Sequence, residues 1–262
     1  MTYSQWTHVK TQDEIKRMQK QPKHDFCATG TNGNNASNDN NAVIDRGPRI
    51  PYAGSNNPRP GQWDGSVMSQ HMIADYKRFS VVDGIGVRNS LYVSGCPFRC
   101  EGCFQPSIFD FHTGFEYTQE LEDRIINDLD YSYVDGITFL GGEPMLNTPI
   151  LIPLARRIRE TYGDDKTIWC WTGYTWEELH RDGETPDKLE LLSMVDVLVD
   201  GRFMQPLKDP MLQFRGSANQ RIIDVHASTA DNVHIWDSLH DEHLDYGEIG
   251  VDERNEHEGS ES

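Results

Sequence analysis

Three of the chain's five cysteines lie close together, at Cys96, Cys100 and Cys103. Three thiols at this tight spacing indicate a metal centre, because thiolates are the ligands that iron–sulfur clusters and soft metal ions prefer. No fourth cysteine or histidine follows at ligand spacing, so a closed zinc site is not completed locally. Bound to a cubane cluster, these thiolates would leave one iron open to a ligand that is not protein. The alternatives are a structural zinc ion with a remote ligand and reduced thiols without metal.

The net charge of the chain limits the kinds of partner it can bind, and its apolar runs and cysteines indicate its compartment. The 262 residues include 24 Lys and Arg against 42 Asp and Glu, a formal net charge of −18. This acidic excess predicts repulsion from nucleic acid and from anionic membranes, so we expect neither as a partner. No apolar run is long enough to span a bilayer, and the N-terminal residues lack a signal peptide's apolar stretch. With an odd cysteine count and clustered thiols, we expect a cytoplasmic protein.

Composition predicts four regions along the chain. Residues 1–45 are polar and rich in asparagine, which predicts a disordered N-terminal extension. Residues 46–74 form an irregular lead-in rich in proline, glycine and asparagine. Residues 75–228 carry the folded domain, and residues 229–262 read as an acidic, disordered tail. Cys27 and the scattered histidines of the tail are expected to be incidental.

The folded region alternates predicted strands with predicted helices. We expect strands over Arg88–Ser94, Gly136–Leu140, Lys166–Trp171 and Val195–Asp200. We expect helices from a Thr118 cap to about Asp130, from Leu151 to Tyr162 and from Asp187 to Met194. Such alternation predicts βαβ units and therefore a parallel sheet.

Four loops follow the predicted strands directly. They are the cysteine loop and the turns Gly141–Pro144, Thr172–Tyr174 and Asp200–Arg202. Ligands of parallel α/β sheets bind at the carboxyl ends of the strands. We therefore expect these four loops to lie on one rim and to form one site.

Several stretches resemble a known family. Cys96-x₃-Cys100-x₂-Cys103, followed by Phe104, resembles the cluster motif of the radical S-adenosylmethionine (SAM) superfamily. Gly141-Gly142-Glu143-Pro144 resembles that superfamily's motif for the SAM amino group. Within the superfamily, further stretches resemble the activating proteins of anaerobic (class III) ribonucleoside-triphosphate reductase: Tyr92–Cys96, Trp171–Tyr174, Val197–Phe203, Lys208–Pro210 and Phe214–Arg221. The resemblance covers about residues 75–225.

The resemblance implies a fold, two cofactors and partners. Residues 75–228 would be a radical SAM domain, an α/β fold built as an incomplete TIM-like β/α barrel with parallel strands. Cys96, Cys100 and Cys103 would ligate a [4Fe-4S] cluster, whose open iron would bind SAM. An electron from the cluster would cleave SAM to methionine and a 5′-deoxyadenosyl radical, which would take hydrogen from a glycine of the reductase. The reductase would be the protein substrate, and a flavodoxin or ferredoxin would donate electrons.

The same resemblance implies a set of SAM contacts: Gly102, Cys103, Phe104, Gly141, Gly142, Glu143, Pro144 and Thr172. Glu143 would offer a negative charge to the SAM ammonium group, and Gly141 and Gly142 would let the backbone approach the ligand closely. No catalytic residue is expected beyond the cluster and the SAM site. Phe104 is alternatively a core residue, and Gly141–Pro144 an ordinary strand-to-helix turn.

Some assignments stay open at this point. Thr172 either lines the SAM pocket or only ends a buried strand, and Arg88 is either structural or part of the site. Cys170 lies between two tryptophans of a predicted strand, so we expect it to be buried and inert. The alternative functions are activation of another glycyl radical enzyme such as pyruvate formate-lyase, and a non-catalytic iron–sulfur or zinc-binding module.

Overall fold

The computed structural model describes residues 56–236. The predicted N-terminal extension, Cys27 and most of the predicted acidic tail lie outside the described residues. Within 56–236, no helix combines the length and the apolar composition that crossing a membrane requires.

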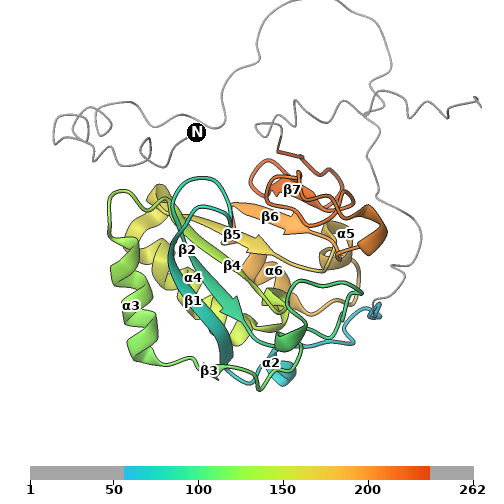
Figure 1. Cartoon of the computed structure of the whole chain (residues 1–262), viewed down its shortest axis with the longest axis horizontal. Coiled ribbons are helices and arrows are strands. Elements are labelled where there is room, and N and C mark those ends of the chain that lie inside the picture. The colour runs from blue at the N-terminus through green and yellow to red at the C-terminus, as the bar shows by residue number, and fades with distance from the viewer. Residues whose placement is uncertain (1–55, 237–262) are drawn as a thin grey trace, which may run out of the picture. The chain divides into compact units, whose positions relative to one another are not determined.

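One open, mixed sheet of seven strands organises the described part of the chain (Figure 1). The strand order is β3-β1-β2-β4-β5-β6-β7. Their bounds are β1 Met72–Ser80, β2 Arg88–Val93, β3 Phe115–Glu116, β4 Gly136–Gly141, β5 Thr167–Trp171, β6 Val197–Asp200 and β7 Arg221–Asp224. The central strands β2, β4, β5 and β6 pair in parallel. The prediction of a parallel sheet is therefore correct for the centre and wrong for both edges, where β1, β3 and β7 run antiparallel.

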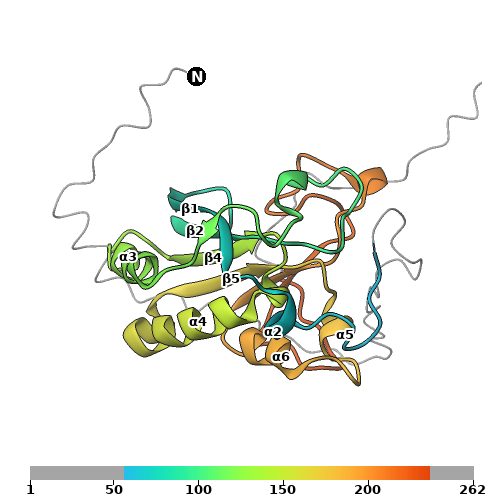
Figure 2. The ribbon, with the colours of Figure 1, turned by 90° about the horizontal axis from the view of Figure 1, so that it is seen from below.

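Helices connect the parallel strands. The α-helices of the described residues are α2 Gly65–Met68, α3 Gln119–Leu129, α4 Thr148–Tyr162, α5 Trp176–Leu179 and α6 Pro186–Leu192. Because β2, β4, β5 and β6 are neighbours in chain order, crossovers of one hand place their helices on the same face of the sheet. Figure 2 shows α4 and α6 together beneath the strands, with the cysteine loop on the opposite side.

Two apolar clusters lie on opposite faces of the sheet. Along β5, Ile168 and Cys170 belong to the main core between the sheet and α4, whereas Trp169 belongs to the second cluster. In β6, Leu198 faces the main core and Val197 faces the second cluster. This alternation follows because successive side chains of a strand point to opposite faces of the sheet. Trp169 pairs with Val197, so these two side chains lie on the same face. Both faces are therefore buried at the centre of the sheet.

Arg88 is a structural residue. Its side chain is 1% exposed and donates hydrogen bonds to Thr138 Oγ1 at 2.9 Å and to the carbonyl oxygens of Ile137 and Thr167, each at 2.7 Å. Its guanidinium also lies 5.3 Å from the ring of Trp169. Burial lowers the pKa of Arg88 to about 9. These contacts tie β2, β4 and β5 together beneath the site.

β1 and β7 are strands that the pattern analysis did not find. β1 pairs with β2 through two register shifts, between Ile73 and Asp75 and between Lys77 and Ser80. Such bulges interrupt the strict alternation by which a half-buried strand is recognised. β7 has only four residues, of which two are buried, so it leaves hardly any periodic signal.

Candidate functional site

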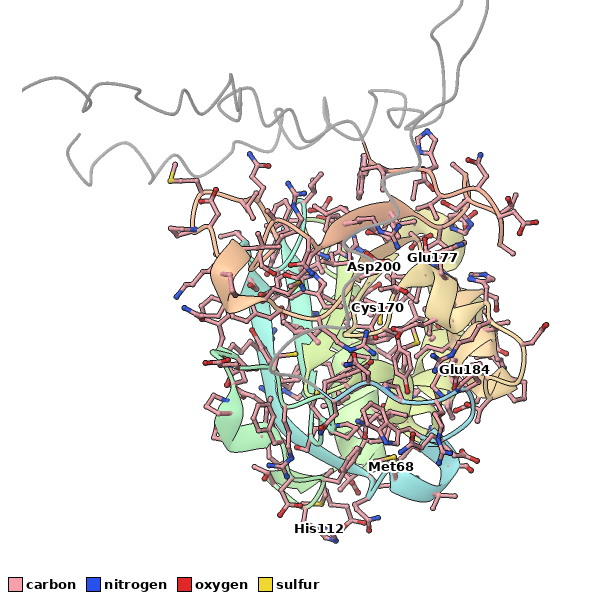
Figure 3. The ribbon with its side chains drawn as sticks, turned by 90° about the vertical axis from the view of Figure 1, so that its right-hand side faces the viewer. Met68, His112, Cys170, Glu177, Glu184 and Asp200 are labelled. Carbon is pink, nitrogen blue, oxygen red and sulfur yellow. The ribbon has the colours of Figure 1, made fainter. Side chains whose placement is uncertain are left out.

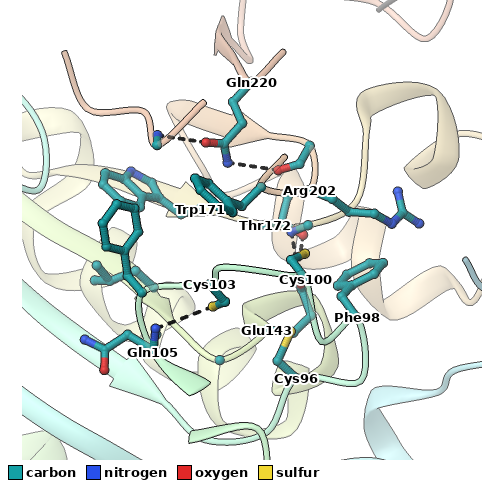
Figure 4. A pocket seen from close by; sticks show the side chains of 18 of the residues that line it. Cys96, Phe98, Cys100, Cys103, Gln105, Glu143, Trp171, Thr172, Arg202 and Gln220 are labelled. Atoms are coloured by element: carbon teal, nitrogen blue, oxygen red, sulfur yellow. Dashed lines mark hydrogen bonds between the residues drawn. The ribbon is translucent and has the colours of Figure 1, made fainter. Parts of the chain in front are cut away.

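The loops that follow the four parallel strands meet around one pocket of about 420 Å³, which we call the thiol pocket (Figure 4). Its wall combines the cysteine loop after β2, the Gly141–Glu143 turn after β4, Thr172 and Gly173 after β5, and Gly201–Phe203 after β6. The expectation that these loops share one rim is confirmed. A pocket of this volume suits a small cofactor.

The three clustered thiols all line this pocket. Cys96, Cys100 and Cys103 are partly buried, and none of them forms a disulfide. Cys103 Sγ accepts a hydrogen bond of 3.5 Å from the Gln105 N–H. The backbone N–H groups of Phe98 and Arg99 lower the pKa of Cys96, and that of Phe203 lowers the pKa of Cys100, each offsetting part of the rise that burial causes. Backbone dipoles that point at sulfur stabilise thiolates, so this loop is suited to anionic sulfur ligands.

Burial raises the pKa of all three thiols, that of Cys100 to about 11. Free thiols in this pocket therefore keep their protons at neutral pH, and these protons would leave when a metal binds. In the described part of the chain, no group of three or more His, Cys, Asp or Glu side chains is placed to hold a single metal ion. In a [4Fe-4S] cluster each thiolate binds a different iron, so the three sulfurs need not converge on one point.

Glu143 is a buried carboxylate in the wall of the same pocket. Its Oε1 accepts hydrogen bonds from Thr172 Oγ1 at 2.6 Å and from the Met145 N–H at 2.9 Å, and its Oε2 accepts one from the Gly173 N–H at 2.8 Å. Burial nevertheless raises the pKa of Glu143 to about 7. A carboxylate has about four acceptor positions, so one position on Oε2 remains for a ligand.

The charge of Glu143 is not neutralised by an ion pair. Among the described ion pairs Glu143 takes part in none, and the nearby Arg202 pairs with Glu178 instead. A buried carboxylate without a cation is costly, and a bound ammonium group would remove part of that cost. The pocket is therefore suited to a ligand that carries a positive charge next to Glu143.

The two glycines before Glu143 are required by packing within the protein. Gly141 has a φ of 106°, and a Cβ added there would lie 2.8 Å from the Cα of Tyr92. A Cβ on Gly142 would lie 2.4 Å from the carbonyl oxygen of Gly95. These glycines thus let the end of β4 approach the cysteine loop, whose Gly95 carbonyl accepts a hydrogen bond of 2.8 Å from the Glu143 N–H.

The other implied SAM contacts fall into two groups. Thr172 lies in the pocket wall, as does Phe104, whose side chain is 67% exposed. The alternative of Phe104 as a core residue is therefore wrong. Gly102 and Pro144 are not part of the pocket wall, and Pro144 is buried where it begins a short 3₁₀ helix. That these residues contact SAM remains a prediction.

The fourth cysteine of the described region plays no part in the pocket. Cys170 is 0% exposed and belongs to the main core; it is labelled in Figure 3. Burial raises the pKa of its thiol well above the usual value. The expectation of a buried cysteine is confirmed.

One wall of the pocket comes from stretches that resemble the family but received no predicted role in the site. The loop between β6 and β7 contributes Phe203, Leu212 and Phe214, and Gln220 at its end. Gln220 joins both ends of this loop, since its Oε1 accepts the Gly216 N–H at 2.8 Å and its Nε2 donates to the Gly201 carbonyl at 2.9 Å. The available signal was the length of this loop, because long loops without regular structure are commonly functional.

Comparison with known proteins places this site in a family. A family model described as a 4Fe-4S single cluster domain matches residues 82–223, which include all three clustered cysteines. The anaerobic ribonucleoside-triphosphate reductase-activating protein of Vibrio cholerae is 44% identical over 151 residues, covering 56% of this chain and 94% of that protein. The chain belongs to this family.

More distant members of the same family match as well. The activating protein of Escherichia coli K12 is 41% identical over 150 residues, which cover 55% of this chain and 93% of that protein. The activating protein of phage T4 is 34% identical over 143 residues, with 54% and 86% coverage. The family assignment supports a [4Fe-4S] cluster as the metal group of this domain.

Proposed function

We propose that this protein activates anaerobic ribonucleoside-triphosphate reductase by generating a glycyl radical on it, as a radical SAM enzyme. The observation that carries the proposal is the thiol pocket, where three amide-supported thiols face a buried, unpaired carboxylate in a chain of the activating-protein family. The electron donor would be a flavodoxin or a ferredoxin.

The cysteine loop would hold the cluster. Cys96, Cys100 and Cys103 would each bind one iron of a [4Fe-4S] cluster, which leaves the fourth iron without a protein ligand. The backbone N–H groups that point at the sulfurs would offset the negative charge of the bound thiolates.

SAM would bind against the Glu143 side of the pocket. The free acceptor position of Glu143 would take the SAM ammonium group, while Thr172 and the Gly173 amide hold the carboxylate in place. The apolar side chains of Phe203, Leu212 and Phe214 would exclude water from the reacting groups. When bound in its reduced form, the cluster would supply the electron for splitting SAM into methionine and a 5′-deoxyadenosyl radical, and this radical would remove a hydrogen atom from a glycine of the reductase.

The open sheet fits this proposal. β2, β4, β5 and β6 follow one another in space as they do along the chain, with α4 and α6 on one face. We interpret them as the strand–helix units of an incomplete β/α barrel of the radical SAM type within residues 75–228. Its unclosed side would give a glycine-bearing loop of the reductase access to the pocket.

Anaerobic reconstitution tests the proposal. We expect the protein to take up about four irons per chain and, after reduction, to convert SAM into 5′-deoxyadenosine. Incubation with the reductase, SAM and a reductant should then give a glycyl radical signal on the reductase by electron paramagnetic resonance. Stoichiometric zinc without SAM cleavage would refute the enzymatic function. A glycyl radical formed on pyruvate formate-lyase but not on the reductase would refute the choice of substrate.

A further inference from the structure

Phe98 occupies the middle of the cysteine loop, between Cys96 and Cys100, and its side chain is 0% exposed. Three side chains surround its ring. The ring centroids of Trp63 and Tyr174 each lie 5.0 Å away in edge-on geometry. The guanidinium of Arg202 lies 4.3 Å from the ring centroid, and Figure 4 labels Phe98 and Arg202. These partners come from the segment before β1 and from the loops after β5 and β6. The loop is therefore anchored at its centre by distant parts of the chain.

Helix α5 holds Arg202 in place. The Arg202 guanidinium, which is 0% exposed, donates two hydrogen bonds to the Glu178 carboxylate, at 2.8 and 2.9 Å. Glu178 is itself positioned by a capping box at the start of α5, where its carboxylate accepts the Thr175 N–H at 3.0 Å and the Thr175 hydroxyl accepts the Glu178 N–H at 3.2 Å. A paired, planar contact of this kind leaves an arginine little freedom.

A strap of residues 56–63 secures the backbone of the same loop. The Asn56 N–H donates to the Phe98 carbonyl at 2.8 Å, and Asn56 Nδ2 donates to the Pro97 carbonyl at 2.5 Å. The carbonyl of Asn56 accepts a hydrogen bond of 3.3 Å from Arg202 Nε. Asn56 and Trp63 both precede the region that the 4Fe-4S family model matches. The strap therefore adds contacts to the cysteine loop from outside the matched region.

The loop needs such contacts. Arg99, next to Phe98, has a φ of 51°, a left-handed conformation that side chains other than glycine seldom adopt. A short loop in this conformation persists only where its surroundings hold it. Without support, the three sulfurs would not keep a fixed spacing in the metal-free protein.

We propose that Asn56, Trp63, Tyr174, Glu178 and Arg202 form a brace that acts through Phe98 to hold the cysteine loop in a cluster-binding conformation before any metal is bound. They are positioning residues, since they would act on the cluster only through the loop. The inference rests on the proposed function, because it concerns the loop that would hold the cluster. The Arg202 charge also favours the thiolate of Cys100, so the experiment must separate charge from position.

Hydrogen–deuterium exchange on the full-length, metal-free protein tests the brace directly. We expect Phe98→Ala and Arg202→Gln to raise the exchange rate of the amides of residues 98–103 about tenfold, the effect of losing one strong buried contact. The amides of α4 should be unchanged. The matched control is Arg156→Gln, which removes an arginine–glutamate pair of 2.8 Å at the surface, between Arg156 and Glu190.

A conservative variant separates position from charge. Arg202→Lys keeps the positive charge but cannot make the paired contact with Glu178 or lie flat on the Phe98 ring. The brace predicts that Arg202→Lys behaves like Arg202→Gln. Wild-type exchange in Arg202→Lys would show that only the charge matters and would overturn the proposal. If near-ultraviolet circular dichroism shows that Phe98→Ala does not fold, Phe98→Leu takes its place. For this variant we expect the amide exchange rate of residues 98–103 to rise about threefold.

Release of iron to a chelator under anaerobic conditions gives the second readout. We expect reconstituted Arg202→Gln and Arg202→Lys to lose iron about tenfold faster than wild type, and Arg156→Gln to match wild type. Equal release together with unchanged exchange in residues 98–103 would overturn the brace. A wild-type protein that takes up no iron would instead refute the proposed function, while the exchange measurement on the metal-free protein still decides whether the brace exists.

Discussion

Thr172 donates a hydrogen bond of 2.6 Å from its hydroxyl to Oε1 of Glu143, and this bond joins the ends of β5 and β4 in the wall of the thiol pocket. The Thr172 N–H in turn donates to the Val199 carbonyl at 2.9 Å, so the contact extends to β6. Thr172 thus links the end of β5 both to the turn after β4 and to β6. The carboxylate that would meet the ligand is held rigidly as a result.

Replacement of Thr172 by valine should weaken both the fold and the site. Valine has the same shape but no donor, so Glu143 loses one of its three hydrogen bonds while it stays buried. We expect the free energy of unfolding of the metal-free protein to fall by about 1–2 kcal/mol and SAM to bind more weakly. Urea unfolding and equilibrium dialysis measure the two effects. Thr172→Ser keeps the hydroxyl and is the control; equal losses in both variants would contradict a role for the hydrogen bond.

Glu143 should make the metal-free protein less stable as the pH rises. Its pKa is about 7 in the folded protein against 4.5 for the free side chain, so the folded state binds the proton more tightly. The stability that this proton contributes is present below pH 4.5 and is lost as the pH rises to about 7. The shift corresponds to about 3 kcal/mol.

The variant Glu143→Gln isolates this effect, because it cannot titrate while every other carboxyl group remains. Unfolding free energies of wild type and Glu143→Gln should therefore diverge between pH 4.5 and about 7, with the steeper fall in wild type. Parallel curves over this range would show that the folded-state pKa of Glu143 is not raised.

Substitution should distinguish the three cysteines that would bind the cluster from Cys170, which lies in the core. We expect Cys96→Ala, Cys100→Ala and Cys103→Ala each to abolish SAM cleavage and to prevent stable uptake of the full cluster, because each change removes one of the three thiols that line the pocket. Iron analysis and the visible absorption of the reconstituted variants measure this. A full cluster with SAM cleavage in any of the three would refute the ligand assignment.

Cys170→Ala is the matched control within the same fold. Its side chain is fully buried beneath the site and does not line the pocket. Iron uptake should therefore equal that of wild type, while the free energy of unfolding falls by about 1 kcal/mol for the lost packing. Loss of the cluster in Cys170→Ala with an intact fold would place a fourth thiol in the site.

Local patterns were sufficient to predict the centre of this protein. The cysteine spacing, the Gly141–Glu143 turn and the strands that precede them are encoded within short windows, and the rule for parallel sheets then places them on one rim. The Thr118 cap could be predicted for the same reason, because its side chain accepts a hydrogen bond from the N–H of Leu121, only three residues later.

The parts that sequence analysis missed depend on distant residues. Arg202 meets Phe98 and Asn56 across more than 100 positions of the chain, and neither contact has a local signature. The antiparallel edges were missed because bulges disturb β1 and because β7 is very short. Gln220 joins the two ends of the loop between β6 and β7, and no periodicity in the sequence reveals this contact.

Gln220→Glu should open that loop without changing the size of the side chain. The carboxylate still accepts the N–H groups of Gly216 and Ser217, but it cannot donate to the Gly201 carbonyl and instead repels it. We expect amide exchange in residues 203–219 to rise about tenfold and SAM affinity to fall, while iron uptake stays at the wild-type level because the loop supplies no ligand. Exchange on the full-length protein and equilibrium dialysis with SAM measure the two effects. Unchanged exchange and affinity would show that the wall is held by its apolar contacts, such as that of Phe214 with Trp169, rather than by Gln220.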